Sequence, residues 1–240
     1  MDNAFHDVLR QGLGWLRLEA RPELVIALET HADELLKWNK KVNLTAVSDP
    51  AEVAEKHFVD SLTVVEELQG ATSLLDLGTG AGFPGVPLAV ALPGLRVTLV
   101  DAVQKKVGFL KQVIARLGLA GRVSAHHVHA EGRPEAEGLP KVEAVVARAF
   151  TEVEGLLRLA RPYLVEGVRV VAMLGRAPEE AELRRVAGEQ GFGLGRLRTF
   201  TLPRSGDPRA VAVFHVERPG KEKEEEQEGK GTGRRQERKE

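Results

Sequence analysis

The sequence contains no cysteine among its 240 residues. This absence excludes disulfide bonds, thiolate metal ligands and cysteine nucleophiles together. Apolar runs long enough to span a bilayer are also missing. The N-terminal segment carries Asp2, His6 and Asp7, whereas a secretory signal has a basic and then an apolar stretch. We therefore expect a cytoplasmic protein that does not bind membranes.

The chain also has no large net charge of either sign, since its formal net charge at pH 7 is -1. Binding to RNA depends on local positive surface, so this total excludes no nucleic-acid partner. Positive charge is in local excess in residues 196–209, which contain four arginines and a single acidic residue, Asp207. Composition favours an ordinary solvated surface there, and contacts to RNA phosphates are the alternative.

The C-terminal residues 219–240 have a different composition from the rest of the chain. They contain seven Lys or Arg, seven Asp or Glu, and no apolar side chain after Pro219. Such a segment buries too little surface to offset the entropy of ordering it. We predict a disordered charged tail for 219–240.

The N-terminal residues 1–70 have a helical pattern. Pro22 fits the first turn of a helix. Residues on one helical face then recur at spacings of three and four: Leu24, Leu28, His31, Leu35, Trp38 and Val42. We interpret His31 as a packed core residue rather than a ligand. The prediction for 1–70 is an N-terminal helical extension.

Residues 71–218 alternate between short β-rich runs and helical runs, which predicts a parallel, doubly wound α/β sheet. The expected strands are 73–77, 96–100, 122–128, 142–147 and 168–174, and the expected helices are 107–117, 152–161 and 178–190. Two late runs, 194–202 and 210–216, flank a turn-rich segment and predict an antiparallel hairpin at one edge.

A glycine-rich segment with the sequence LDLGTGAGFPG, residues 75–85, follows the first of these strands directly. Glycine allows sharp turns and close approach of a ligand to the backbone. In an open α/β sheet this position is the ligand crevice at the carboxyl ends of the strands. A nicotinamide dinucleotide loop has glycine at its sixth position, where this chain has Phe83. Gly78, Gly80 and Gly82 after Asp76 instead resemble the first motif of class I methyltransferases, which bind S-adenosylmethionine.

Three further positions follow later strands. Asp101 ends the second strand, where a carboxylate accepts ribose hydroxyls in both cofactor classes or caps the following helix. Ala130 and Glu131 follow the third strand, at a place that usually borders the adenine. Arg148 follows the fourth, where a buried cation needs a partner or a cleft. It is suited to hold a cofactor carboxylate, a phosphate or a target base.

The sequence closely resembles the RsmG family, also called glucose-inhibited division protein B. The residues that carry the resemblance are the blocks 38–45 (WNKKVNLT), 57–62 (HFVDSL), 76–89 (DLGTGAGFPGVPLA) and 148–150 (RAF). The resemblance runs from about Leu24 to Val216. It implies a class I methyltransferase with a Rossmann-like fold that methylates N7 of guanine 527, in the 530 loop of 16S rRNA, using S-adenosylmethionine.

By motif, the resemblance implies a set of cofactor residues: Gly78, Gly80, Phe83, Asp101, Ala102, Val103, Ala130, Glu131 and Arg148. Arg148 acts by positioning, and no general base is expected. The substrate side would comprise Asn39, Asn43, Thr45, His57, Arg176 and Arg204. For the first four of these, helix packing and turn hydrogen bonds are an equally supported interpretation. The implied partner is 16S rRNA or the small ribosomal subunit, and we expect a monomer.

Two positions depart from the family pattern. His129 replaces an arginine before the pair at 130–131, and Leu174 replaces a lysine before Gly175. We expect no metal site, because His126 and His127 lack a clear set of carboxylate partners. The alternatives left open are a methyltransferase acting on another RNA, a protein or a small molecule, a nicotinamide-dependent oxidoreductase, and a catalytically silent RNA-binding factor.

Overall fold

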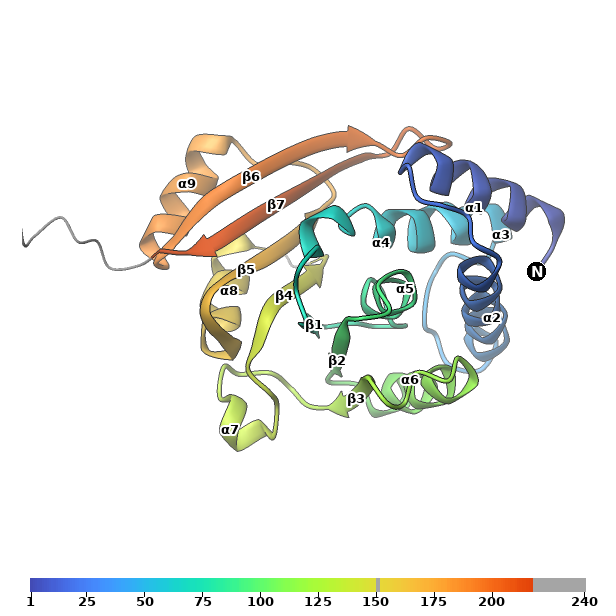
Figure 1. Cartoon of the computed structure of the whole chain (residues 1–240), viewed down its shortest axis with the longest axis horizontal. Coiled ribbons are helices and arrows are strands. Elements are labelled where there is room, and N and C mark those ends of the chain that lie inside the picture. The colour runs from blue at the N-terminus through green and yellow to red at the C-terminus, as the bar shows by residue number, and fades with distance from the viewer. Residues whose placement is uncertain (150–151, 218–240) are drawn as a thin grey trace, which may run out of the picture.

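The fold is a seven-stranded sheet between helical layers (Figure 1). The computed structural model describes residues 1–149 and 152–217. The predicted tail and Phe150 of the family motif lie outside the described residues. The strands are β1 (Ser73–Leu77), β2 (Arg96–Asp101), β3 (Val123–His127), β4 (Val142–Arg148), β5 (Leu164–Leu174), β6 (Phe192–Thr201) and β7 (Pro208–Val216).

The strand order is β3-β2-β1-β4-β5-β7-β6. Strands β1 to β5 pair in parallel, β7 pairs antiparallel with β5, and β6 pairs antiparallel with β7. This arrangement confirms the predicted doubly wound, mostly parallel sheet with a C-terminal antiparallel hairpin. The ligand crevice of such a sheet lies where the strand order reverses, here beside β1 and β4.

The N-terminal region is helical, as predicted. It consists of α1 (Asn3–Trp15), α2 (Pro22–Asn39), α3 (Pro50–Val53), the π-helix η1 (Ala54–Val59), α4 (Asp60–Leu62) and the 3-10 turn η2 (Glu66–Leu68). Pro22 lies at the start of α2, where a backbone N–H would have no acceptor within the helix, so a proline costs no hydrogen bond. The expected helix over 24–42 ends three residues earlier, at Asn39.

The remaining helices cover the two faces of the sheet. They are α5 (Gly85–Ala91), α6 (Gln104–Arg116), α7 (Pro134–Glu137), α8 (Val153–Ala160), the 3-10 turn η3 (Arg161–Tyr163) and α9 (Glu180–Glu189). Figure 1 shows α2, α5 and α6 on one side of the sheet, with α8 and α9 on the other.

Alternate residues of each parallel strand face opposite cores, as the period of two requires. Leu74 of β1 joins a core with the N-terminal helices, while Leu75 joins a core with α8 and α9. The N-terminal helices therefore share a core with the sheet. The boundary at residue 70 stays a prediction.

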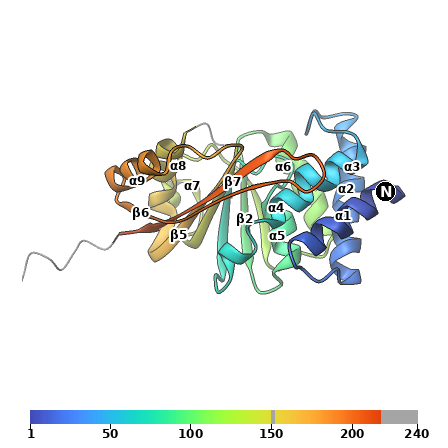
Figure 2. The ribbon, with the colours of Figure 1, turned by 90° about the horizontal axis from the view of Figure 1, so that it is seen from above.

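The hairpin β6–β7 crosses the molecule, and its turn lies against the N-terminal helices (Figure 2). Buried Glu55 of η1 accepts the backbone N–H groups of Arg204 at 2.5 Å and Ser205 at 3.0 Å. One carboxylate therefore docks a turn that lies about 150 residues later in the chain.

Candidate active site

The glycine-rich loop between β1 and α5 presents open backbone at the carboxyl edge of the sheet. Gly78 and Gly80 have φ values of 70° and 62°, in the left-handed region that favours glycine. A Cβ added at either position would meet no atom within 4 Å. The backbone there is therefore exposed to a space that a ligand can occupy.

Asp76 holds the two ends of this loop together from beneath. Its Oδ2 accepts the Thr79 hydroxyl at 2.6 Å and the Gly85 N–H at 2.8 Å. A Cβ at Gly85 would lie 2.3 Å from Leu99 and 2.7 Å from this carboxylate, so only glycine fits. Burial raises the pKa of Asp76 to about 6, although both hydrogen bonds favour the ionised form.

Asp101, at the end of β2, contacts the loop from its side. Its Oδ2 accepts the Gly80 N–H at 2.9 Å, and its Oδ1 accepts the Val103 N–H at 2.8 Å. Lys106 lies 3.7 Å from the same carboxylate. The N-cap of α6 is Val103, which has no side-chain cap, so the capping role considered for Asp101 is wrong, and its bond to Val103 orders the turn before the helix.

Phe83 lies inside an aromatic stack that joins the loop to the N-terminal helices. Its ring stacks on His31 and on His57, with ring centroids 4.8 Å apart in each case. Only 3% of Phe83 is exposed, so its side chain supports the loop from behind. His31 is fully buried, which confirms its interpretation as a core residue.

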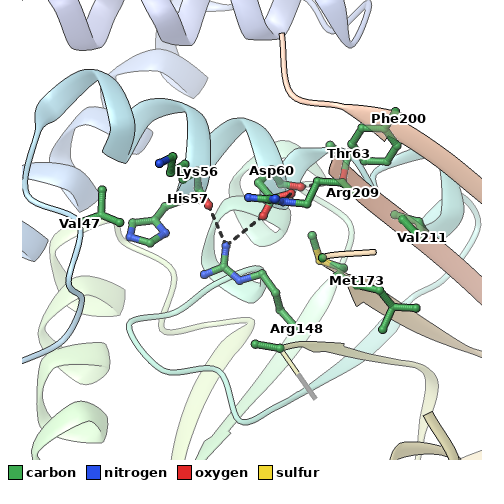
Figure 3. Close-up of a pocket in the computed structure, with 14 residues that line it drawn as sticks. Val47, Lys56, His57, Asp60, Thr63, Arg148, Met173, Phe200, Arg209 and Val211 are labelled. Carbon is green, nitrogen blue, oxygen red and sulfur yellow. Dashed lines mark hydrogen bonds and ion pairs between the residues drawn. The ribbon is translucent and has the colours of Figure 1, made fainter. Parts of the chain in front are cut away.

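A cavity of about 450 Å³ adjoins this stack at the ends of β4 and β5 (Figure 3). Arg148 lines it and donates to the Lys56 carbonyl oxygen at 3.2 Å. The same guanidinium lies 3.6 Å from Asp60 and 5.3 Å from the Phe83 ring centroid. The other lining residues are Val47, His57, Thr63, Ala149, Met173, Leu174, Gly175, Phe200, Arg209, Ala210 and Val211.

Three charged groups of this cavity form an ion-pair cluster around buried Asp60. Asp60 lies between Arg148 and Arg209, and the Arg209 Nε donates to it at 3.1 Å. Burial raises the pKa of Asp60 and lowers that of Arg148, while the ion pair acts in the opposite direction on both. Burial and the nearby Arg148 charge lower the pKa of His57 to about 4, so its imidazole is neutral at pH 7.

Comparisons with known proteins place the chain in a family. A sequence profile described as rRNA small subunit methyltransferase G matches residues 25–190. The Myxococcus xanthus (strain DK1622) protein named ribosomal RNA small subunit methyltransferase G is 52% identical over 218 residues, covering 90% of this chain and 100% of that protein. The Anaeromyxobacter sp. (strain Fw109-5) protein of the same name is 50% identical over 216 residues, with the same coverage.

The chain belongs to the rRNA small subunit methyltransferase G family. This confirms the resemblance drawn from the sequence motifs and the predicted methyltransferase assignment. It also contradicts the oxidoreductase alternative. Among solved structures, a SAM-dependent methyltransferase from Aquifex aeolicus matches with a TM-score of 0.56 at 17% identity, covering 73% of this chain and 97% of that one. At this identity the likeness shows the fold.

Within this methyltransferase family fold, the predicted substrate residues divide into two groups. Asn39 uses its amide within its own loop: Oδ1 accepts the N–H groups of Leu44 and Thr45, and Nδ2 donates to the Thr45 carbonyl at 2.9 Å. The Thr45 Oγ1 lies 2.8 Å from His57 Nε2 and also accepts the Val47 N–H. Asn39 and Thr45 therefore make the turn hydrogen bonds that were the alternative interpretation.

Three of the other four predicted substrate residues lie at the surface. Asn43, Arg176 and Arg204 are exposed, whereas His57 is half-buried and lines the 450 Å³ cavity. Arg176 lines an adjoining cavity that also contacts Ala149. Their role in binding RNA stays a prediction.

The predicted cofactor residues beyond the glycine loop lie along the same edge of the sheet. Ala102 is exposed and its carbonyl oxygen lies 3.0 Å from His127 Nε2, and Val103 is 44% exposed. Ala130 is half-buried, and exposed Glu131 forms an ion pair with Arg133.

The arginines of the hairpin were considered as phosphate contacts, and three of them have another role. Arg196 lies 3.3 Å from Glu66 and 3.4 Å from Glu67. Arg198 donates to the Thr63 carbonyl at 2.5 Å, and Arg209 pairs with Asp60. These contacts fasten the hairpin to α4 and η2. Arg204 alone of the four forms no ion pair with the described part of the chain.

The sequence did not single out Lys56, Asp60 or Met173 as site residues, and it offered Arg209 only as a phosphate contact. Asp60 stood inside the family block 57–62, which was a usable signal. Arg209 reaches the site from a strand 149 residues away, and no local pattern indicates that contact. Ala149 has a φ of 60° at the cavity rim, a costly conformation for a residue other than glycine.

In the residues that the structure describes, no group of three or more His, Cys, Asp or Glu side chains is placed to hold a metal ion. No described helix is long and apolar enough to cross a membrane.

Proposed function

We propose that this chain transfers a methyl group from S-adenosylmethionine to N7 of guanine 527 in the 530 loop of 16S rRNA. The observation that carries the proposal is the open backbone at Gly78 and Gly80, beside the cavity that Arg148 lines. A cofactor site next to a base-sized cavity is the arrangement that direct methyl transfer requires. Membership of the rRNA small subunit methyltransferase G family supports the RNA substrate.

The residues at the glycine loop fit S-adenosylmethionine. Gly78 and Gly80 have room for the amino-acid half of the cofactor, which carries no phosphate. Each oxygen of Asp101 accepts one backbone N–H and keeps a lone pair for a ribose hydroxyl. We assign the adenine side to Ala102 and Val103 on one strand end and to Ala130 and Glu131 on the next. When bound, the cofactor supplies an activated methyl group on a sulfonium.

The chemistry asked of the chain's own residues is positioning. Guanine N7 carries an exposed lone pair and needs no deprotonation before it reacts. The enzyme therefore has to orient the base and exclude water. We assign the base to the cavity of about 450 Å³, where Arg148 presents a fixed cation and His57 a neutral imidazole. In this proposal Arg148 faces the base, and Phe83 acts on the cofactor only through the loop that it supports.

The RNA approaches across the exposed rim of this cavity. We assign Asn43, Arg176 and Arg204 to RNA contacts, because their side chains are exposed. Asn39 and Thr45 act indirectly by holding the loop that carries Asn43. The target base has to be unstacked to enter, as for other enzymes that modify bases.

The test is methyl transfer from labelled S-adenosylmethionine to small subunits that lack the modification. We expect label at one guanine N7, mapped by cleavage of the RNA at 7-methylguanine, and no label when guanine 527 is replaced by adenine. Naked 16S rRNA in parallel shows whether the particle is required. Label elsewhere in the RNA would contradict the site, and binding of S-adenosylmethionine without transfer would favour the silent RNA-binding alternative.

The same assay tests the absence of a general base. Single-turnover rates should change little between about pH 6 and pH 8, because N7 has no proton to lose. A steep dependence governed by one side chain would contradict this part of the proposal. Calorimetric titration with NAD serves as the negative control for cofactor class.

A further inference from the structure

The loop after β3 is held by a phenol and a carboxylate that the proposed mechanism does not use. Tyr163, at the end of η3, is fully buried, and its hydroxyl donates to Glu137. The same hydroxyl oxygen accepts the Gly132 N–H at 2.9 Å. Glu137, the last residue of α7, accepts the N–H groups of Glu131 at 2.8 Å and Arg133 at 3.2 Å.

Three consecutive backbone donors, those of residues 131, 132 and 133, are thus taken by two side chains. Gly132 has a φ of 81°, and a Cβ there would lie 3.4 Å from Pro162, which precedes Tyr163 in the chain. The loop is therefore fixed against the connection between α8 and β5. The backbone N–H of Ala130 has no acceptor within the described residues.

The ionisation states suit this arrangement. Burial, together with the hydrogen bond to Glu137, raises the pKa of Tyr163 to about 12, so the phenol remains a donor at neutral pH. Burial acts to raise the pKa of Glu137, but hydrogen bonds from Tyr163 and from the loop N–H groups outweigh it and lower the pKa. A charged acceptor beside a neutral donor gives the stronger, charge-assisted kind of hydrogen bond.

We propose that Tyr163 and Glu137 are positioning residues for cofactor binding, which set the backbone of residues 130–133 so that Ala130 faces the adenine. This inference rests on the proposed function, since it assigns the adenine to this loop. The pair occupies the donors of residues 131–133 and leaves the Ala130 N–H available to the ligand. Tyr163 and Glu137 themselves need not touch the cofactor.

Three variants test the inference. Tyr163→Phe keeps the buried ring but removes both hydroxyl contacts, and Glu137→Ala removes the acceptor for two loop N–H groups. Glu137→Gln keeps one acceptor oxygen and should recover part of the effect. We expect the Kd for S-adenosylmethionine to rise about tenfold in the first two variants, since each lost contact leaves a donor unpaired. With saturating cofactor, kcat should stay within about twofold of wild type, because the guanine cavity is unaltered.

Hydrogen exchange at the amides of 131–133 gives a readout that needs no ligand, and protection there should fall in Tyr163→Phe. Leu156→Ala is the matched control, because Leu156 is fully buried in the same core and its apolar side chain makes no hydrogen bond to the loop. It should lower Tm without changing the Kd.

The outcomes separate the inference from the proposed function. Unchanged cofactor affinity in Tyr163→Phe and Glu137→Ala overturns the inference, and so does an equal loss of affinity in Leu156→Ala. If wild type itself binds no S-adenosylmethionine, the proposed function fails, whatever the exchange data show. Should Tyr163→Phe not fold, the comparison of Glu137→Ala with Glu137→Gln decides the matter.

Discussion

The Nε2 of His31 donates to the backbone carbonyl oxygen of Ala81 across 2.9 Å, which ties helix α2 to the glycine-rich loop. The acceptor is a carbonyl, so the proton of the neutral ring sits on Nε2. The opposite nitrogen, Nδ1, is buried without a partner among the described residues. A second proton on this ring would place an unpaired charge in the core.

His31→Gln tests the pH dependence that follows. Burial lowers the pKa of His31 in the folded protein from 6.5 to about 4. The unfolded chain therefore binds a proton more readily, and stability is lost as pH falls from 6.5 through 4. Urea unfolding should show a loss of about 3 kcal/mol over this interval that His31→Gln lacks. His129→Gln, which removes an exposed imidazole instead of a buried one, is the control for the substitution itself.

Asp76→Asn should change the profile in the opposite direction. The folded-state pKa of Asp76 is raised from 3.8 to about 6 by burial, so its contribution to stability is present below 3.8 and lost as pH rises through 6. Asn keeps an acceptor for Thr79 and Gly85 but has no charge. The difference in unfolding free energy, variant minus wild type, should grow by about 3 kcal/mol from pH 4 to pH 7. A constant difference would show that Asp76 is not desolvated as the structure indicates.

In the wild type the pH dependence of stability from His31 is opposite in sign to that from Asp76. His57 shares the direction of His31, because its pKa is also lowered to about 4. The free energy of unfolding of the wild type therefore changes little with pH, although each group contributes a steep dependence. The single variants separate these contributions.

Much of the fold was predictable because its signals are local. Alternating buried runs placed the parallel strands β1 to β4 within one residue of their observed bounds, whereas β5 begins four residues before its predicted start. Asp101 was placed correctly because it ends a strand of recognisable pattern. Local signals of this kind depend on backbone geometry and burial period, which the sequence carries directly.

The ion pairs that dock the hairpin were not predictable. Arg198 and Glu67 lie 131 residues apart in the chain. The sequence around an arginine does not distinguish one that contacts RNA from one that pairs with a buried carboxylate. Phe83 shows the same limit: no local pattern indicates that its ring is enclosed by two histidines from distant helices, and its contact with the cofactor stays a prediction. Partner choice among charged and aromatic side chains is decided by the tertiary arrangement.

Gly80→Ala should weaken cofactor binding beyond its effect on stability. Gly80 has a φ of 62° and Gly118 a φ of 65°, and neither would place a Cβ within 4 Å of another atom. Both Ala variants therefore carry the same backbone strain, about 1 to 2 kcal/mol. Only Gly80→Ala puts a methyl group where the cofactor binds, and we expect a Kd at least about tenfold higher by calorimetry. An equal Kd for S-adenosylmethionine in the two variants would show that the glycine loop is not part of the cofactor site.

Arg148→Lys separates base positioning from cofactor binding. The guanidinium donates to the Lys56 carbonyl, faces Asp60 and lies over Phe83, a geometry that a lysine ammonium cannot reproduce. The charge is kept, so Asp60 still lies between two cations and the protein should fold. Methyl transfer to the small subunit should fall about 10- to 100-fold through misplacement of the base, with cofactor Kd within about twofold. Arg158→Lys, on the exposed face of α8, is the control and should match wild type in both measurements. Loss of cofactor affinity with an unchanged kcat would instead assign Arg148 to the cofactor carboxylate, the other role that its position after β4 allows.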